Sequence, residues 1–171
     1  MARTCPVTGE TVLYTECTGC EDRAVCRAGD IKPVFAMLVV GSRSVTDYPF
    51  FKSKMDLLLS RVKDSCRILI VSGGAAGADT LAERYAAENG YALKVMKADW
   101  KKGNAAGYIR NREMHRYVSG FEKRGCAAFW DGRSSGTRHS FSLAEEFGTP
   151  LRVILCRDGP GRTLPDSGQK T

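Results

Sequence analysis

Residues 67–79, RILIVSGGAAGAD, combine the pattern of a buried strand with that of a tight turn into a helix. The stretch begins as a short apolar run, typical of a strand buried on both faces, and continues as a turn of glycine and alanine that leads into a helix. Residues 35–40 (FAMLVV), which end at Gly41, predict a second strand of the same kind. Parallel sheets produce this order, because each strand must be followed by a crossover connection, usually a helix.

The same alternation of strand and helix continues to residue 155. Further strands are predicted over residues 92–96, 126–130 and 151–155. Helices are predicted between the strands by apolar residues at helical spacing, namely Met55, Leu58, Leu59 and Val62; Ala78, Leu81, Ala82, Tyr85 and Ala86; Met114, Tyr117, Val118 and Phe121; and Phe141, Ala144 and Phe147. We therefore expect an α/β, doubly wound, Rossmann-like and mainly parallel sheet of five strands, in the order 3-2-1-4-5 when they are counted along the chain.

The composition excludes several classes of protein. The chain has 171 residues, of which 43% are hydrophobic and 26% charged, as in globular proteins. No apolar run approaches the roughly 20 residues that a membrane span needs, and we expect a cytoplasmic protein without a secretory signal. We expect a cysteine-rich module over residues 1–33, the α/β domain over 34–156 and a flexible tail over 157–171.

Positive charge is concentrated in one window of the sequence. The net charge of the chain is +7, and residues 94–124 hold nine Lys or Arg against three acidic residues. One interpretation is a face that binds the phosphates of a nucleotide or a nucleic acid. The other is a solvated helix face, which is a common reason for a run of charges.

Four of the seven cysteines crowd the first 26 residues. Cys17 and Cys20 have the spacing of a tetrahedral zinc site, which Cys5 and Cys26 would complete. We expect a structural zinc ion, because metal binding supplies folding energy to a segment without a core of its own. Free thiols or a redox pair are the alternative. The other cysteines, Cys66, Cys126 and Cys156, are expected to be small buried apolar residues.

Ligands of an open parallel sheet bind outside the carboxyl ends of its strands, and three turns there are unusual. Residues 72–79 and 131–137 are rich in Gly and Ser, and each leads into a predicted helix. They therefore offer the unpaired N–H groups of a helix N-terminus to an anion. Arg43 lies on the third turn, although ordinary tight turns are also rich in Gly and Ser. The sequence predicts a phosphate pocket with the candidate residues Gly41, Ser42, Arg43, Ser72, Gly73, Gly74, Ala75, Gly77, Asp79, Asp131, Gly132, Ser134, Gly136 and Thr137.

Several familiar motifs are absent from the sequence. It contains neither the P-loop pattern nor the G-x-G-x-x-G pattern of dinucleotide-binding folds. It has no G-x-S-x-G elbow, and its two histidines are expected on a basic helix (His115) and in a loop (His139).

Residues 35–155 resemble the SLOG superfamily of Rossmann-like, nucleotide-derivative-binding domains. The similar branch is the YspA/YpsA-related group of bacteria and phages, on the strings VVGSRSVTD (39–47), ILIVSGGAAGADTLAERYA (68–86), KADWKKGNAAGYIRNREM (97–114) and AFWDGRSSGTRHS (128–140). The resemblance implies ligands such as ADP-ribose, NAD-related molecules or nucleoside phosphates, with Arg110 and Asn111 reaching the phosphate or sugar. It also implies self-association into a homo-oligomer.

The superfamily includes phosphoribohydrolases, whose motifs this sequence matches in part. Arg110 and Met114 fit the pattern R-x-x-x-M, and Gly132, Gly136 and Thr137 fit the phosphate-binding turn, but Ser140 stands where those enzymes have an acid. Serine replaces a carboxylate poorly in glycosidic hydrolysis. We therefore expect a sensor or a weak hydrolase. The catalytic candidates are Arg110, Asp79 and Asp131, and a helix cap is the alternative role for Asp79.

The alternative function is binding of single-stranded nucleic acid. The DNA-processing protein DprA belongs to the same superfamily, and its SGxxxGxD turn is similar to residues 72–79. The basic window and the cysteine-rich start agree with this hypothesis. Aromatic residues are not interleaved with basic ones as in a stacking platform, and Trp130 is expected in the core rather than against a base.

Overall fold

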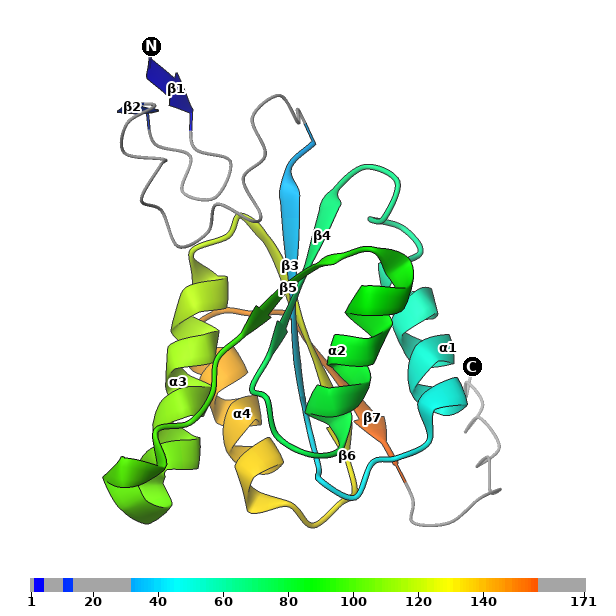
Figure 1. The fold of residues 1–171 in the computed structure, drawn as a ribbon, viewed down its shortest axis with the longest axis vertical. Coiled ribbons are helices and arrows are strands. Elements are labelled where there is room, and N and C mark those ends of the chain that lie inside the picture. Colours follow the sequence, from blue (N-terminus) through cyan, green and yellow to red (C-terminus); the bar gives the residue numbers. More distant parts are fainter. Residues whose placement is uncertain (1, 5–10, 14–31, 157–171) are drawn as a thin grey trace, which may run out of the picture.

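The computed structural model describes residues 2–4, 11–13 and 32–156, and a five-stranded parallel sheet forms its centre (Figure 1). The strands are β3 (Val34–Gly41), β4 (Arg67–Ser72), β5 (Ala92–Val95), β6 (Lys123–Trp130) and β7 (Leu151–Leu155). They lie in the order β5-β4-β3-β6-β7, which is the predicted order 3-2-1-4-5. The predicted fold class is therefore confirmed.

The central strand β3 is buried on both faces, as its unbroken apolar sequence predicts. It pairs with β4 on one side and β6 on the other, so that Leu38 is in register with both Val71 and Cys126. Met37 and Val39 belong to one core cluster and Leu38 and Val40 to the other. This alternation follows the period of two that places successive side chains on opposite faces of a sheet.

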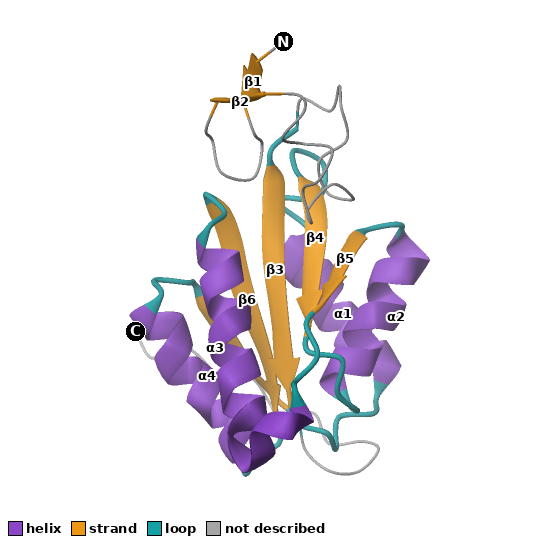
Figure 2. Ribbon diagram, turned by 60° about the vertical axis from the view of Figure 1, so that its left-hand side comes forward, coloured by secondary structure: helices purple, strands orange, loops and turns teal. Residues whose placement is uncertain are grey.

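Two helices cover each face of the sheet (Figure 2). Side chains of α1 (Tyr48–Leu59) and α2 (Ala78–Asn89) pack in one core cluster, and those of α3 (Ala106–Ser119) and α4 (Ser135–Glu146) pack against the other. Val62, Phe121 and Phe147 lie just beyond helix ends, although the sequence pattern included them in helices. Phe121 is nevertheless buried in the core, in one cluster with Met114 and Val118 of α3.

The segment expected to be a polar loop, residues 98–107, is mostly helical. It forms the 3-10 helix η3 (Trp100–Ala105) and the start of α3. The Asp99 side chain accepts a hydrogen bond from the N–H of Lys101 and so caps η3. Gly103, with φ of 70°, gives η3 a kink before α3 begins.

The first residues contribute a small antiparallel pair, β1 (Ala2–Thr4) with β2 (Thr11–Leu13). The four cysteines predicted to bind zinc and the expected tail over 157–171 lie outside the described residues. Within the described part no three His, Cys, Asp or Glu side chains gather as a metal site would need. None of the described helices has both the length and the apolar composition for crossing a membrane.

Candidate functional site

A cavity of about 570 Å³ lies at the carboxyl ends of the central strands, where the sequence predicts a ligand. Its volume is in the range of small-molecule sites. Ten of the predicted residues line it: Gly41, Arg43, Ala75, Asp79, Arg110, Asn111, Asp131, Ser134, Gly136 and Thr137. Loops after β3, β4 and β6 thus meet helix α3 around one space.

The other predicted residues lie behind the cavity wall or beside it: Ser42, Ser72, Gly73, Gly74, Gly77 and Gly132. Ser42 and Ser72 are buried and used by the protein itself. The Ser42 hydroxyl accepts the N–H of Asp131 at 3.1 Å, and the Ser72 hydroxyl donates to Glu83 at 3.0 Å. These two serines shape the turns and do not face the cavity.

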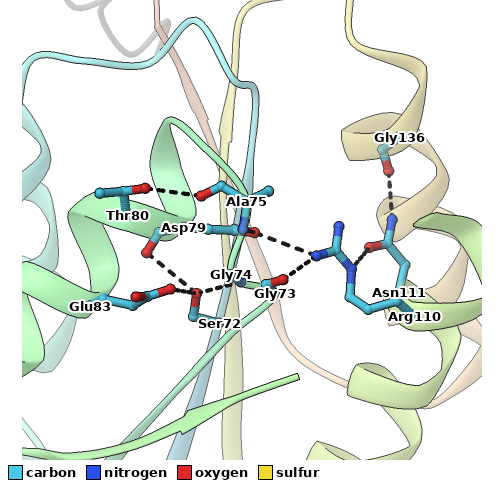
Figure 3. A network of polar contacts seen from close by, with 10 residues as sticks. All are labelled: Ser72, Gly73, Gly74, Ala75, Asp79, Thr80, Glu83, Arg110, Asn111 and Gly136. Carbon is cyan, nitrogen blue, oxygen red and sulfur yellow. Dashed lines mark hydrogen bonds and ion pairs between the residues drawn. The ribbon is translucent and has the colours of Figure 1, made fainter. Parts of the chain in front are cut away.

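The turn between β4 and α2 is filled by a carboxylate of its own (Figure 3). Asp79 lies in the first turn of α2, and its Oδ2 accepts the backbone N–H of Ala75 at 3.1 Å. The N-cap residue is Gly77, so Asp79 does not cap this helix as the alternative interpretation supposed. Burial raises the pKa of Asp79 to about 6, against the opposing effects of the Ala75 N–H and the Arg110 charge.

Glycines in and beside this turn are required by close packing. A Cβ on Gly73 would lie 2.1 Å from Nη1 of Arg110, and a Cβ on Gly41 would lie 2.4 Å from that of Ala78.

Two further glycines of this turn have a positive φ. Gly77, with φ of +80°, would place a Cβ 2.4 Å from the carbonyl oxygen of Ser42. Gly74, with φ of +66°, would meet Val95 at 2.9 Å. A side chain at any of these four glycine positions would therefore collide with neighbouring protein atoms.

Helix α3 ties the two glycine-rich turns together (Figure 3). The Arg110 guanidinium donates a hydrogen bond to the carbonyl of Gly73 and lies 3.7 Å from Asp79. Next to it, the Asn111 amide donates to the carbonyl of Gly136 at 3.2 Å and accepts from Nε of Arg110 at 3.1 Å. Both side chains thus hold the cavity wall in addition to lining it.

The turn between β6 and α4 is built around Asp131. Its Oδ1 accepts the N–H groups of Arg133 and Ser134, both at 2.8 Å, and its Oδ2 accepts the Ser44 hydroxyl at 3.0 Å. The Ser134 N–H above all, together with the other donors, lowers the pKa of Asp131 to about 2. This carboxylate is therefore ionised and shapes the turn.

The N-terminus of α4 faces the cavity without an acidic residue of its own. Its N-cap is Ser134, which accepts the N–H of Thr137, and its first turn contains no Asp or Glu. Ser135 and Gly136 line the cavity, and their N–H groups have no acceptor in the described part of the chain. Unpaired N–H groups at a helix N-terminus favour an anion.

Arg43 supplies positive charge to the same space. It is exposed and lines the cavity, and it forms no hydrogen bond or ion pair with the residues that the structure describes. Burial lowers the pKa of Arg110, and the nearby charge of Arg43 lowers it further. Arg43 is therefore available to an anionic ligand, whereas Arg110 is already paired with Asp79.

Some residues of the cavity wall were not predicted from the sequence. They are Val40, Ser44, Trp100, Asn104, Gly107, Tyr108 and Ser135; Met114 and Ser140, which the hydrolase motifs had singled out, line the cavity as well. Trp100 and Asn104 lie on the 3-10 helix η3, on either side of the kink at Gly103, and Tyr108 lies on α3, so no single helical period in the sequence reveals them. Trp130, in contrast, lies outside the cavity and packs edge-on against Phe141, as expected of a core residue.

Of three polar side chains on α3 and α4, His139 alone lies elsewhere than expected, whereas His115 lies on a helix, α3, as predicted. His139 lies within α4 rather than in a loop, because this helix begins at Ser135 and continues through residue 146. Ser140 is fully buried, and its hydroxyl has no partner among the described residues. His115 is equally buried, and burial lowers its pKa to about 4, so it is neutral at physiological pH.

Comparisons with known proteins agree with this architecture. Residues 36–103 match the YAcAr family, described as the YspA, cpYpsA-related SLOG family. The chain is 40% identical over 90 residues to the Gene 61 protein of Mycobacterium phage D29, a match that covers 49% of this chain and 69% of that protein.

A solved structure supports the fold independently. DprA from Streptococcus pneumoniae is similar with a TM-score of 0.50 and 21% identity, over 77% of this chain and 52% of that one. This chain therefore spans about half the length of that protein, and the likeness concerns the fold alone. Together, the family match and the phage relative show that the chain belongs to the YspA, cpYpsA-related SLOG family.

Proposed function

We propose that the cavity binds a nucleotide-derived small molecule, such as ADP-ribose, an NAD-related molecule or a nucleoside phosphate, through its phosphate. One observation carries this proposal: the open N-terminus of α4 lines the same cavity as Arg43, which has no partner among the described residues. The phosphate accepts hydrogen bonds from the N–H groups of Ser135 and Gly136, and Arg43 neutralises its charge. The hydrogen bond from Ser44 to Asp131 holds the Arg43 loop beside this turn.

A binding role fits the cavity better than efficient hydrolysis. Ser140 stands where related hydrolases have an acid, and its hydroxyl is buried in the wall. Asp131 is ionised and accepts three hydrogen bonds, so it has little capacity left to activate water. Asp79 is the remaining carboxylate of the wall, and it is paired with Arg110. We therefore propose a sensor of the ligand.

Calorimetry with AMP and ADP-ribose tests the proposal. Arg43→Ala should weaken binding by about 1.5–3 kcal/mol, the range for hydrogen bonds to charged groups. Lys101→Ala and Lys102→Ala serve as matched controls, because these lysines carry the same charge on nearby η3 but do not line the cavity. Loss of binding in the lysine variants together with full binding by Arg43→Ala would overturn the proposal.

The second candidate function is binding of single-stranded nucleic acid. The observation in its favour is the exposed Trp100, which η3 presents next to Lys101 and Lys102. Such binding weakens steeply with salt, because each phosphate contact releases counterions. Titration of an oligonucleotide and of AMP at two salt concentrations separates the two candidates. Salt-tolerant binding of AMP with negligible oligonucleotide binding supports the small-molecule proposal.

A further inference from the structure

We propose that Trp100, Asn104 and Tyr108 form a nucleobase subsite beside the phosphate position. This inference rests on the proposed function. It assigns the base of the nucleotide to the part of the cavity that η3 and the start of α3 form. All three residues line the cavity, and they come from η3 and the first turn of α3. The sequence and the family comparison assign no ligand to them.

The position and exposure of Trp100 are the first evidence for the subsite. Its indole lines the cavity and remains 62% exposed, so the core does not account for it. The Asp99 cap fixes the helix that carries it, so that the ring is presented on a defined element. A planar aromatic ligand that stacks on the indole would remove apolar surface of both partners from water.

Tyr108 connects this end of the cavity with the phosphate turn. Its hydroxyl donates a hydrogen bond to the Ser135 hydroxyl at 3.3 Å, and its ring meets that of His139 edge-on at 4.9 Å. The ring is thereby held against the first turn of α4, with 44% of the residue still exposed. Tyr108 therefore lies directly beside the proposed phosphate position, on the side of the cavity from which η3 contributes Trp100 and Asn104.

Asn104 adds hydrogen-bonding capacity to the same wall. It lies four residues from each of the two aromatic residues, is exposed, and has no hydrogen-bond partner within the described residues. An amide both donates and accepts, as does the edge of a nucleobase. A stacking ring, a free amide and a nearby anion site together match a base joined to a phosphate through a sugar. A ligand of sugar and phosphate alone would leave Trp100 and Asn104 unused.

Paired titrations of AMP and ribose 5-phosphate test the subsite, because the two ligands differ by the base. Trp100→Ala should weaken AMP binding about 5- to 150-fold, the span of one base–aromatic stack, and change ribose 5-phosphate binding less than about twofold. Trp100→Phe should restore most of the AMP affinity. Phe50→Ala, a partly exposed aromatic residue of α1 outside the cavity, should change neither ligand.

The outcomes separate this subsite from the phosphate site. If Trp100→Ala leaves AMP binding unchanged, or weakens both ligands equally, the base subsite is wrong while the phosphate site stands. If the wild-type protein binds neither ligand, the proposed function itself fails. Loss of oligonucleotide binding in Trp100→Ala with unchanged AMP binding would also overturn the subsite and favour the nucleic-acid alternative.

Indole fluorescence gives a second measurement on the folded protein. AMP should quench the emission of Trp100 when its base stacks on the ring, whereas ribose 5-phosphate should not. The change should disappear in Trp100→Phe, in which Trp130 is the remaining tryptophan. An AMP-dependent change that persists in this variant would contradict stacking on Trp100.

Discussion

The carboxylate of Asp79 lies 3.7 Å from the guanidinium of Arg110 and accepts the N–H of Ala75 at 3.1 Å. The protein thus supplies the anion at the N-terminal turn of α2 from its own chain. The corresponding turn of α4 has no acidic residue in its first turn and opens into the cavity. Of the two glycine-rich turns, the one before α4 is therefore the one whose helix N-terminus has no carboxylate of its first turn beside it.

A double-mutant cycle tests the packing of Arg110 on the first turn. Gly73→Ala would place a Cβ 2.1 Å from Nη1 of Arg110 and so expel the guanidinium from Asp79 and the Gly73 carbonyl. Each of Gly73→Ala and Arg110→Ala should destabilise the fold, but the double variant should lose less than their sum, with a coupling of about 0.5–3 kcal/mol. Denaturant unfolding measures all four free energies.

Gly107→Ala is the matched control for this cycle. Gly107 lies in α3, and a Cβ there meets no atom within 4 Å. The substitution should stabilise the helix by up to about 1 kcal/mol. Strict additivity of Gly73→Ala and Arg110→Ala would show that the two residues do not depend on one another.

The buried carboxylate of Asp79 makes stability depend on pH. Burial raises its pKa to about 6, above the ordinary value of 3.8, so the folded state holds this proton more tightly than the unfolded state. The resulting stabilisation is complete below about pH 4 and is lost as the pH rises through about 6. The free energy of unfolding, relative to Asp79→Asn, should fall across this window by no more than about 3 kcal/mol.

Urea unfolding of both proteins at pH 4 to 7 measures this difference. The asparagine variant keeps the shape of the side chain and does not titrate in this range. A difference that grows with pH would mean that Arg110 and the N–H of Ala75 outweigh burial, and that the pKa of Asp79 is lowered.

Ser140 leads us to expect little or no phosphoribohydrolase activity. Its hydroxyl cannot replace the carboxylate that glycosidic hydrolysis requires. Release of base from nucleoside monophosphates should stay far below about 1 s⁻¹. Turnover at such a rate would require another carboxylate, and comparison of Asp79→Asn with Asp131→Asn would identify it.

The four N-terminal cysteines predict one zinc ion per chain. Elemental analysis of protein purified without added metal should find about one equivalent, because we propose that Cys5, Cys17, Cys20 and Cys26 together bind the ion as four thiolates. Cys17→Ser with Cys20→Ser should remove the metal, and Cys156→Ser in the α/β domain should retain it. Less than about a tenth of an equivalent in the wild type, with all four thiols titratable, would refute the site.

Order and pairing of the strands could be predicted because they depend on patterns that a sequence displays directly. Runs such as residues 67–71 and 35–40 are apolar throughout, and the handedness of crossovers leaves few arrangements of five parallel strands. The same rules placed the turns that follow β3, β4 and β6 around one crevice. The sequence could therefore indicate that Arg43 and the turn at 134–137 lie around one cavity.

The side chains that pack against the two turns could not be predicted, because they come from segments far apart in the sequence. Glycines at a helix N-terminus have the same appearance whether they admit a phosphate or make room for a guanidinium. Gly73 faces Arg110, which is 37 residues away, and no local spacing reveals this contact. Trp100 and Tyr108 could not be predicted for a different reason. Residues 98–107 are polar and contain glycine, a composition typical of a loop rather than of the helix η3.

The most direct test of the open α4 turn is an AMP titration of Gly136→Asp and Ala76→Asp by calorimetry. A Cβ on Gly136 meets no atom within 4 Å, and an acid in the first turn of a helix is favourable, so this variant should fold. Ala76 is exposed just before α2 and does not line the cavity, so its variant adds the same charge at the closed turn. We expect Gly136→Asp to abolish AMP binding and Ala76→Asp to retain it. Binding retained by Gly136→Asp and lost by Ala76→Asp would contradict the account and place the anion at the turn that Asp79 occupies.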